Sequence, residues 1–359
     1  MGNVSRFRLG GVLSWLPFAA MAIVAVVDIV AGAGVGFLPL ISLGPAFAGL
    51  TGGLRRTAGI GVLALVLCLL LSLFNGQFAD RRGNTAMIGV VGVSAAGLVA
   101  TARRQRREAE LASVRDIAEV AQRVLLRPVP LTAGPLRVAV SYTSAVAEAR
   151  IGGDLYEVVI SPGGVRVIVG DVQGKGLDAV ETAAVVLGAF REAAYDESEL
   201  VAVGERLERA LGRHLSDEKF VTAVLAEFRP DGTVTLLDFG HPPPLLVRGD
   251  GTVGFVEPPE AAPPLGLSAL GAFDGLGQIE PVPYGFAFAP GDQLLFYTDG
   301  VTEARDPENR FYPLAERAAM LKDPDPQHAL DAMRRDLVAH VERPLRDDAA
   351  MLLLRYREV

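Results

Sequence analysis

Four long apolar stretches occupy the first part of this chain, and they limit its fold more than any other feature. They span residues 12–32, 35–53, 57–74 and 85–101. Each is close to the ~20 residues that a helix needs to cross the hydrocarbon core of a bilayer. The first stretch is too long, and too soon followed by the others, to be a cleaved signal peptide. We therefore predict a transmembrane region of four helices over residues 1–102.

Arginines around these stretches predict the orientation of the region. The clusters that precede the first stretch, separate the second from the third and follow the fourth are Arg6 and Arg8, Arg55 and Arg56, and Arg103, Arg104, Arg106 and Arg107. With four spans all three clusters lie on one side, which the positive-inside rule assigns to the cytoplasm. Arg81 and Arg82 oppose this assignment but are outnumbered. The expected location is the cell (inner) membrane, multi-pass, with the rest of the chain cytoplasmic.

Net charge changes sign along the chain. It is +4 up to Ala102, +3 over 103–127 and −15 from Pro128 onward. A strongly acidic module is a poor ligand for phosphate backbones, which bind Lys and Arg, so nucleic acid is excluded as an expected partner. Cys68 is the single cysteine, which excludes an intrachain disulfide.

A helix is predicted to connect the apolar region to the remainder of the chain. Residues 103–126 contain neither Gly nor Pro and are good helix formers. Apolar positions recur at spacings of three and four, at Leu111, Val114, Ala118, Ala121 and Leu125. This seam allows two interpretations: one face packs on the next domain, or two copies pair as a parallel coiled coil and form a homodimer. Pro128 and Pro130 end the helix, giving a connecting segment 103–127 and a second domain 128–359.

Short β-type runs alternate with helix pairs in the second domain. Strands are predicted at 136–143, 155–161, 164–170, 220–228, 233–239, 243–248, 252–256, 293–298 and 349–356, and helices at 177–194, 197–214 and twice within 313–342. The Pro- and Gly-rich segment 258–283 is expected to be loop. Strands at both ends with helix pairs between them indicate an α+β domain built on antiparallel sheets.

Four aspartates stand at the boundaries of predicted strands: Asp154, Asp171, Asp299 and Asp347. Side chains at the ends of separate strands can converge on one point. Hard divalent cations take oxygen ligands gathered from several segments. The four carboxylates together therefore predict a metal site.

Five ordered strings extend this pattern. They are Gly152-Gly153-Asp154-Leu155-Tyr156-Glu157, Gly170-Asp171-Val172-Gln173-Gly174-Lys175-Gly176, Gly240-His241-Pro242-Pro243, Tyr297-Thr298-Asp299-Gly300-Val301-Thr302-Glu303-Ala304 and Asp347-Asp348-Ala349. Over about 128–357 the chain resembles the SpoIIE/RsbU branch of the PPM metal-dependent serine/threonine phosphatases. The resemblance implies an αββα sandwich of two antiparallel sheets flanked by helices, with the metal site at one edge of the sheets.

The resemblance also implies roles for individual residues. Asp154 and Asp171 would bind a pair of Mn²⁺ or Mg²⁺ ions, with Asp171 bridging, and the carbonyl of Val172 would add a ligand. Asp299 and Asp347 would complete the coordination of one ion, with Asp348 ranked below Asp347. Two such ions activate a water for attack on a phosphoserine or phosphothreonine ester. In this branch the substrate is typically a small regulatory protein, an anti-anti-sigma factor.

The chain departs from the family at several positions. Glu157 replaces an Asp, which is expected to alter metal affinity or preference more than activity. Gln173 stands where many eukaryotic relatives have a His, so a water would protonate the leaving group. Arg150 is the nearest candidate for the phosphate-binding arginine, at a different offset. Lys175 would contact phosphate or cap the helix that follows, while the roles of His241 and Glu303 are left open.

Two other function classes compete with this interpretation. The first is a receptor whose phosphatase-like domain binds partners without catalysis, which retention of all four aspartates disfavours. The second is a diguanylate cyclase, suggested by Gly152-Gly153-Asp154. That class needs an acidic residue and Phe next in a hairpin turn, whereas this chain continues with Leu155 and Tyr156.

Overall fold

A computed structural model describes residues 2–31, 37–78, 81–143, 152–214, 219–267, 280–342, 344–345 and 347–357. The chain divides into two compact units, Met1–Ser113 and Val114–Val359. Each unit is described by itself. The predicted limits at 102 and 127 stay predictions: the helix Arg81–Leu125 runs through residue 102 and ends just before residue 127.

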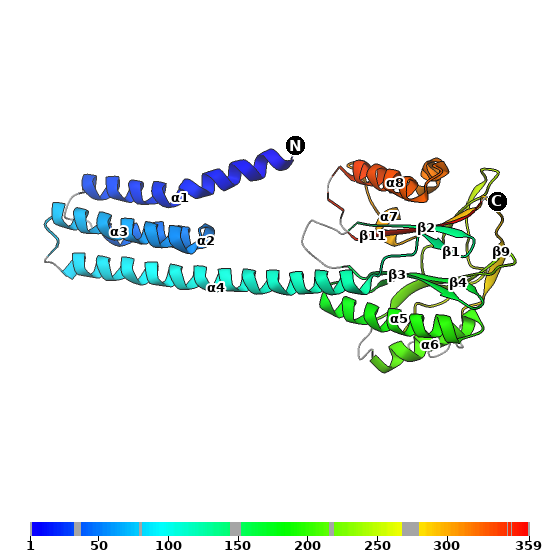
Figure 1. Cartoon of the computed structure of the whole chain (residues 1–359). Coiled ribbons are helices and arrows are strands. Elements are labelled where there is room, and N and C mark those ends of the chain that lie inside the picture. The colour runs from blue at the N-terminus through cyan, green and yellow to red at the C-terminus, as the bar shows by residue number, and fades with distance from the viewer. Residues whose placement is uncertain are drawn as a thin grey trace. The chain divides into compact units, whose positions relative to one another are not determined.

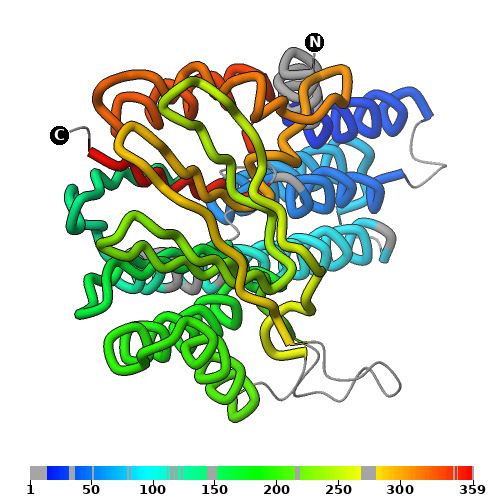
Figure 2. The backbone as a smooth tube through the Cα atoms, turned by 90° about the vertical axis from the view of Figure 1, so that its right-hand side faces the viewer, coloured from blue at the N-terminus to red at the C-terminus, as the bar shows by residue number. Residues whose placement is uncertain are grey.

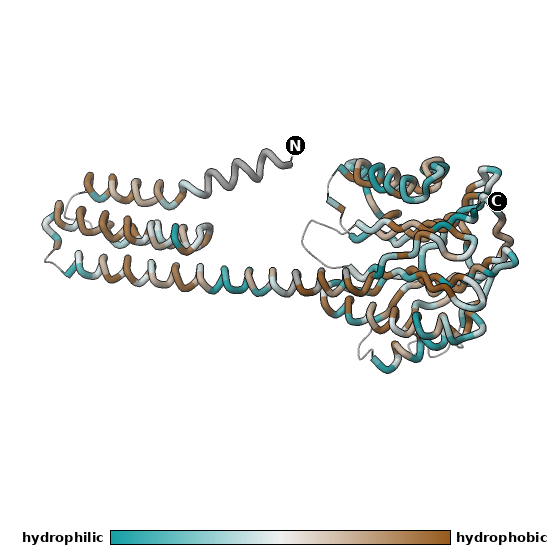
Figure 3. The backbone as a smooth tube through the Cα atoms, in the orientation of Figure 1, coloured by the Kyte–Doolittle hydropathy of each residue, from teal (hydrophilic) through white to brown (hydrophobic). Residues whose placement is uncertain are grey.

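The first unit is made of apolar helices. Its elements are α1 (Gly2–Ala31), the short 3-10 helix η2 (Leu38–Ser42), α2 (Leu43–Thr51), α3 (Leu54–Phe74) and the first part of α4 (Arg81–Leu125). Three of these helices contain segments long and apolar enough to cross a membrane: Ser14–Ala31, Leu54–Phe74 and Gly83–Glu110. Their apolar character is visible in the hydropathy colouring (Figure 3).

The predicted second span was wrong. In its place the structure has η2 followed by α2, and the apolar helical segment Leu38–Leu50 is too short to cross. At ~1.5 Å per residue it extends about 20 Å, against a hydrocarbon core of about 30 Å. Pro39 lies in the first turn of η2, and extended backbone at Gly52 ends α2. Among the described residues, the apolar unit therefore has three helices long enough to cross a membrane and one apolar helical segment that is too short.

Arginine side chains close one end of this helical unit. Arg104 of α4 donates to the carbonyls of Gly49, Leu50 and Gly52, the last carbonyls of α2 and its cap. These groups have no partner within their own helix, so the guanidinium satisfies them. Arg56 of α3 donates to the carbonyl of Ser14 in α1. Ser14 of α1, the start of α3 and the end of α2 thus share one level of the unit.

The second unit contains two antiparallel sheets. The first has the order β1 (Thr132–Ala133), β2 (Leu136–Thr143), β11 (Ala349–Tyr356), β10 (Gln293–Tyr297), β7 (Leu245–Val247) and β8 (Val253–Phe255). The second has the order β3 (Asp154–Ser161), β4 (Gly164–Val172), β5 (Val221–Phe228), β6 (Thr233–Phe239) and β9 (Tyr284–Ala287). We call them the β11 sheet and the β4 sheet.

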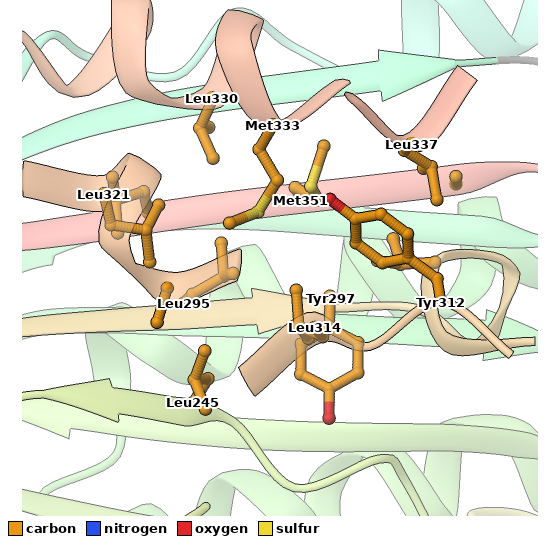
Figure 4. Close-up of a cluster of buried hydrophobic side chains, with 14 of the residues drawn as sticks. Leu245, Leu295, Tyr297, Tyr312, Leu314, Leu321, Leu330, Met333, Leu337 and Met351 are labelled. Atoms are coloured by element: carbon orange, nitrogen blue, oxygen red, sulfur yellow. The ribbon is translucent and has the colours of Figure 1, made fainter. Parts of the chain in front are cut away.

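Helices cover the outer faces of both sheets, which gives four layers (Figures 1 and 2). Helices α5 (Leu177–Asp196) and α6 (Leu200–His214) pack on the β4 sheet. Helix α8 (Pro326–Val341) and the 3-10 segment η4 (Leu314–Lys322) pack on the β11 sheet through the cluster drawn in Figure 4. A third cluster fills the space between the sheets. The predicted αββα sandwich is confirmed.

The end of α4 belongs to the second unit. Its Ala121 and Leu125 pack against Val180 of α5, and the carbonyl of Leu125 accepts a hydrogen bond from Arg191 of α5 at 2.8 Å. These two positions of the predicted seam therefore pack on the domain, as the first interpretation of the helix expected. The side chains of Leu111, Val114 and Ala118 lie outside the described part of the structure.

Candidate metal and phosphate site

Two of the predicted ligands face each other across neighbouring strands. Asp154 begins β3, Asp171 lies near the end of β4, and the two are directly paired in the antiparallel register. Tyr156 and Val158 follow Asp154 at intervals of two and line the space between the sheets. Because side chains alternate along a strand, Asp154 also faces that space. The first two carboxylates thus meet at the edge of the sandwich.

The β11 sheet brings the other two carboxylates to the same edge. Asp299 starts the short helix α7 (Asp299–Thr302) directly after β10, and Asp347 precedes β11. A Cβ at Gly300 would lie 1.8 Å from the carbonyl oxygen of Asp348. Only glycine therefore lets α7 approach the backbone that carries Asp347.

Thr298 joins the two sheets beneath the carboxylates. Its hydroxyl donates to Asp154 Oδ2 at 2.8 Å and accepts from the backbone N–H of Ala350 at 2.9 Å. Thr298 is fully buried. The sequence string before Asp299 contains Thr298 but predicts no role for it. A threonine next to a candidate ligand at a strand end was the available signal.

Burial, and then repulsion from neighbouring carboxylates, raises the pKa of Asp154, Asp171 and Asp299. Burial, and then the charge of Asp171, raises the pKa of Asp154 well above its ordinary value. Burial, then the charges of Asp299 and Asp347, raises the pKa of Asp171 to about 7. Burial and Asp347 also raise the pKa of Asp299. Four carboxylates that repel one another in this way form a site that a cation stabilises.

Lys175 contacts a predicted ligand. Its Nζ lies 2.6 Å from Oδ1 of Asp347, and both side chains are partly exposed. Helix α5 begins at Leu177 with Gly176 as its N-cap and has no side-chain cap hydrogen bond. The alternative in which Lys175 caps this helix is therefore wrong. The other alternative, in which the ammonium group of Lys175 contacts phosphate, stays a prediction.

Glycines 152 and 153 allow the chain to enter β3 between the acidic segments. A Cβ at Gly152 would lie 2.0 Å from Oδ2 of Asp348, and one at Gly153 would lie 2.3 Å from the carbonyl oxygen of Val172. The carbonyl of Gly153 accepts from the N–H of Val172 at 3.1 Å. Both positions therefore require glycine. They also place the predicted ligand carbonyl of Val172 beside the turn before Asp154.

His241 holds the two sheets together at this edge. Its Nδ1 lies 3.2 Å from the hydroxyl of Thr222, and its Nε2 lies 3.0 Å from the carbonyl oxygen of Tyr297. A carbonyl only accepts, so Nε2 carries a proton. Burial lowers the pKa of His241 to about 4, so the ring is neutral near pH 7. The role left open by the sequence is thus a structural one.

Glu157 points away from the carboxylate cluster. Its Oε2 accepts from Nε of Arg191 on α5 at 2.5 Å, and its neighbours in alternation, Leu155 and Val159, pack on the helices that cover the β4 sheet. The expectation that Glu157 alters metal affinity or preference is corrected accordingly: it anchors α5 to β3. Arg150, the candidate phosphate arginine, lies outside the described residues.

The family follows from a comparison with known protein families. The family model for stage II sporulation protein E (SpoIIE) matches residues 161–357, more than half of the chain. The chain belongs to the SpoIIE family. Its second unit is therefore a PP2C-type domain of the metal-dependent serine/threonine phosphatase class.

Solved structures share the fold of this SpoIIE-family domain. The RsbU and RsbW domains of Rv1364c from Mycobacterium tuberculosis match with a TM-score of 0.52 and 25% identity, over 65% of this chain and 62% of that one. The SiaA PP2C domain of Pseudomonas aeruginosa matches with a TM-score of 0.57 and 21% identity, over 70% of this chain and 98% of that one. The alignment thus spans less than two thirds of the Rv1364c chain.

The string Gly152-Gly153-Asp154 does not lie in a hairpin turn. The turn that joins β3 to β4 is at Ser161 and Gly164, at the opposite end of these strands. Leu155 and Tyr156 continue β3 instead. The arrangement that a diguanylate cyclase needs is therefore absent from this segment.

The donor set suits a hard divalent cation. The candidate ligand atoms are all oxygens, from the four carboxylates and the carbonyl of Val172, as hard divalent cations prefer. Within the described residues, no group of three or more His, Cys, Asp or Glu side chains is placed so that it could hold a metal ion. Burial and the charges of neighbouring carboxylates raise the pKa of Asp171, and a bound cation would relieve the repulsion between these carboxylates.

Proposed function

We propose that this protein is a membrane-anchored serine/threonine phosphoprotein phosphatase that uses two Mn²⁺ or Mg²⁺ ions. The observation that carries the proposal is the cross-strand pair of Asp154 and Asp171. Asp299 and Asp347 are close enough to raise the pKa of Asp171. Such a cluster of repelling carboxylates has no advantage for stability, and carboxyls with strongly shifted pKa values concentrate at functional sites.

The residues of the cluster have distinct proposed tasks. Asp154 and Asp171 would hold the ions from the β4 sheet, together with Asp299 and Asp347 at the ends of strands of the β11 sheet. Ions bound there would supply an acidified water and neutralise the phosphoryl oxygens. Thr298 orients Asp154 through its hydroxyl. Lys175 lies where its ammonium group can move from Asp347 to an incoming phosphate.

Hydrolysis of p-nitrophenyl phosphate and of a phosphoserine peptide by the full-length protein with Mn²⁺ tests the proposal. We expect Asp171→Asn to reduce turnover by about a hundredfold or more, because the bridging carboxylate is lost. The matched control is Asp250→Asn in an exposed turn, whose carboxylate accepts from the N–H of Thr252. Absence of hydrolysis with either metal, with partner binding intact, would favour the non-catalytic receptor instead.

A phosphoserine on a small regulatory protein of the anti-anti-sigma type is the proposed substrate. The structure that matches at 25% identity is named for its RsbU and RsbW domains, which supports a partner from the same kind of regulatory system. Phosphoproteomics that compares wild-type cells with an Asp154→Asn strain identifies the substrate. A phosphosite on such a regulator should accumulate only in the variant, and accumulation elsewhere would redirect the proposal.

The proposed location is the inner membrane with the phosphatase domain in the cytoplasm. Arg56 and Arg104 both bind backbone at the same end of the apolar unit, and arginines concentrate on the cytoplasmic side. Asp28 and Asn75 form a 2.8 Å hydrogen bond between α1 and the residue after α3. Alkaline phosphatase fused after Phe78 should be active and after Arg104 inactive. The reverse pattern would contradict this orientation.

A further inference from the structure

We propose that Gln122, Tyr142 and Asp348 are positioning residues that hold the turn before Asp154, so that the end of α4 sets the metal affinity of the site. The inference rests on the proposed phosphatase function. All three side chains lie in the second unit, and none of them is among the residues expected to bind metal.

The peptide groups of Gly152 are held from both sides. Its N–H donates to Oδ2 of Asp348 at 3.1 Å, and its carbonyl accepts from Nε2 of Gln122 at 3.2 Å. Gly152 lies two residues before Asp154. Turning the backbone at Gly152 breaks both hydrogen bonds, so the direction in which the chain enters β3 is set by groups outside that strand.

Tyr142 connects these two partners. Its hydroxyl donates to the same Oδ2 of Asp348 and accepts from Nε2 of Gln122 at 2.8 Å. The amide nitrogen of Gln122 has two hydrogens, one for Tyr142 and one for Gly152. Asp348 is 2% exposed and Gln122 is 8% exposed. Because water has little access, removal of one member leaves a buried polar group without its partner.

Adjacent aspartates divide the two tasks. Asp347 is half exposed, contacts Lys175 and raises the pKa of Asp171. Asp348 is buried and accepts from Tyr142 and Gly152. One residue thus faces the candidate ligands, and its neighbour fixes the turn that presents Asp154.

Helix α4 reaches β3 on both sides of Asp154. Gln122 contacts Gly152 before it. Arg191 bridges the carbonyl of Leu125, the last residue of α4, to Glu157 after it. Ala121 and Leu125 seat the same helix end on α5. A displacement of this helix end would therefore change the position of Asp154.

The test uses the full-length protein in nanodiscs with Tyr142→Phe and Gln122→Ala. Electron paramagnetic resonance of free Mn²⁺ measures binding directly, and hydrolysis gives the Mn²⁺ concentration for half-maximal rate. Loss of residues that orient ligands weakens metal binding by about tenfold or more, and we expect that loss here. Turnover at saturating Mn²⁺ should stay within about twofold of the wild type, because the ligands themselves are intact.

Two matched controls separate this effect from general loss of hydrogen bonds. Tyr312 donates to Asp336 at 2.8 Å beneath α8, and Gln327 donates to the carbonyl of Val140 at 3.3 Å. Tyr312→Phe and Gln327→Ala should bind Mn²⁺ as the wild type does. Equal weakening in the controls overturns the proposal.

A double variant tests whether the residues act as one network. Tyr142→Phe combined with Gln122→Ala should weaken Mn²⁺ binding little more than the more severe single change, because interacting residues are not additive. Fully additive losses overturn the network. If Gln122→Ala does not fold, Gln122→Glu decides the matter, since it keeps the volume but cannot donate.

The outcomes also separate this inference from the proposed function. A wild-type protein that neither binds Mn²⁺ nor hydrolyses phosphate esters removes the phosphatase proposal itself. A wild-type protein that does both, with variants that bind Mn²⁺ equally well, removes only the positioning network. A variant that unfolds at a lower temperature than the wild type, yet binds Mn²⁺ equally well, also removes only the positioning network.

Discussion

Arg166 of β4 and Glu227 of β5 form an ion pair in which Nη2 and Oε1 are 2.6 Å apart and each side chain is 2% exposed. The guanidinium also donates to the carbonyls of Ala194, Glu197 and Ser198. Ala194 lies in the last turn of α5, and Glu197 and Ser198 lie in its connection to α6. A single buried side chain thus attaches both helices to the sheet that carries Asp154 and Asp171.

Removal of Arg166 should strongly destabilise the domain. Arg166→Ala leaves Glu227 buried with only Arg229 as a charged partner, and breaking a buried pair typically costs about 3–5 kcal/mol of unfolding free energy. Arg209→Ala is the control, because its pair with Glu205 is 4.0 Å long and exposed and is worth at most about 1 kcal/mol. Urea unfolding followed by circular dichroism measures both. A similarly small loss of unfolding free energy in both variants would contradict the role of Arg166.

Asp238 should make stability depend on pH. Burial raises its pKa to about 6, and Oδ2 has no hydrogen-bond partner among the described groups. The folded state therefore binds the proton more tightly than the unfolded chain, and stability falls as pH rises from about 4 through 6. At pH 8 the charged Asp238 lowers the free energy of unfolding by about 3 kcal/mol, because its pKa is raised by about two units.

Asp238→Asn should remove this cost. Asn keeps an acceptor for the N–H of Gly240, which now binds Oδ1 at 2.8 Å. We expect the variant to be more stable than the wild type at pH 8 and the difference to shrink toward pH 4. Thermal unfolding across this range checks it, and a difference that does not change with pH would exclude the titration of Asp238 as its cause.

Two glycine-to-alanine changes should differ in their effects: one should lower the rate of hydrolysis, and the other should stabilise a helix. Gly152→Ala places a Cβ 2.0 Å from the carboxylate of Asp348, which displaces the turn before Asp154. A shift of about 1 Å at a catalytic group can cost about a hundredfold in rate, so we expect a comparable loss. Gly188→Ala in α5 meets nothing within 4 Å and should stabilise the helix by about 0.5–1 kcal/mol. Unaltered hydrolysis by Gly152→Ala would refute the tight fit.

A second copy of the chain should pair along α4. Ile117, Val120 and Val124 are 59%, 61% and 74% exposed, and their spacing of three and four is that of a coiled-coil seam. Val120→Cys in a Cys68→Ser background should form a disulfide-linked dimer when membranes are oxidised. Glu205→Cys, on an exposed position of α6, should not. Absence of the Val120 crosslink would leave the homodimer without support.

Local patterns predicted most strands but not those made by tertiary contacts. Runs such as 136–143 and 349–356 agree with β2 and β11 because their apolar residues are buried on both faces. Strand β9 was missed, since its Gly285 disfavours a strand in isolation. In the sandwich a Cβ at Gly285 would lie 2.5 Å from the carbonyl oxygen of Val234. Close packing against β6, and not local propensity, explains that residue.

The candidate metal ligands were predictable from the sequence, whereas the residues that hold them in position were not. The Asp residues stand beside glycines at strand ends, a signal carried by neighbouring residues. The partner of Asp348, Tyr142, is 206 positions away, and no local pattern connects them. The side of Glu157 was predictable in principle: it lies three positions after Asp154, and an odd offset along a strand places two side chains on opposite faces.

Strand β11 lies between β2 and β10 in its sheet, although β2 comes more than two hundred residues earlier in the chain. During synthesis, β2 must therefore wait for its partner until nearly the whole domain has been translated. Sheets that depend on such distant pairing form slowly, and their open edges attract other chains. A ribosome-bound nascent chain of this protein is thus expected to require chaperone protection and to acquire phosphatase activity only after β11 emerges from the exit tunnel.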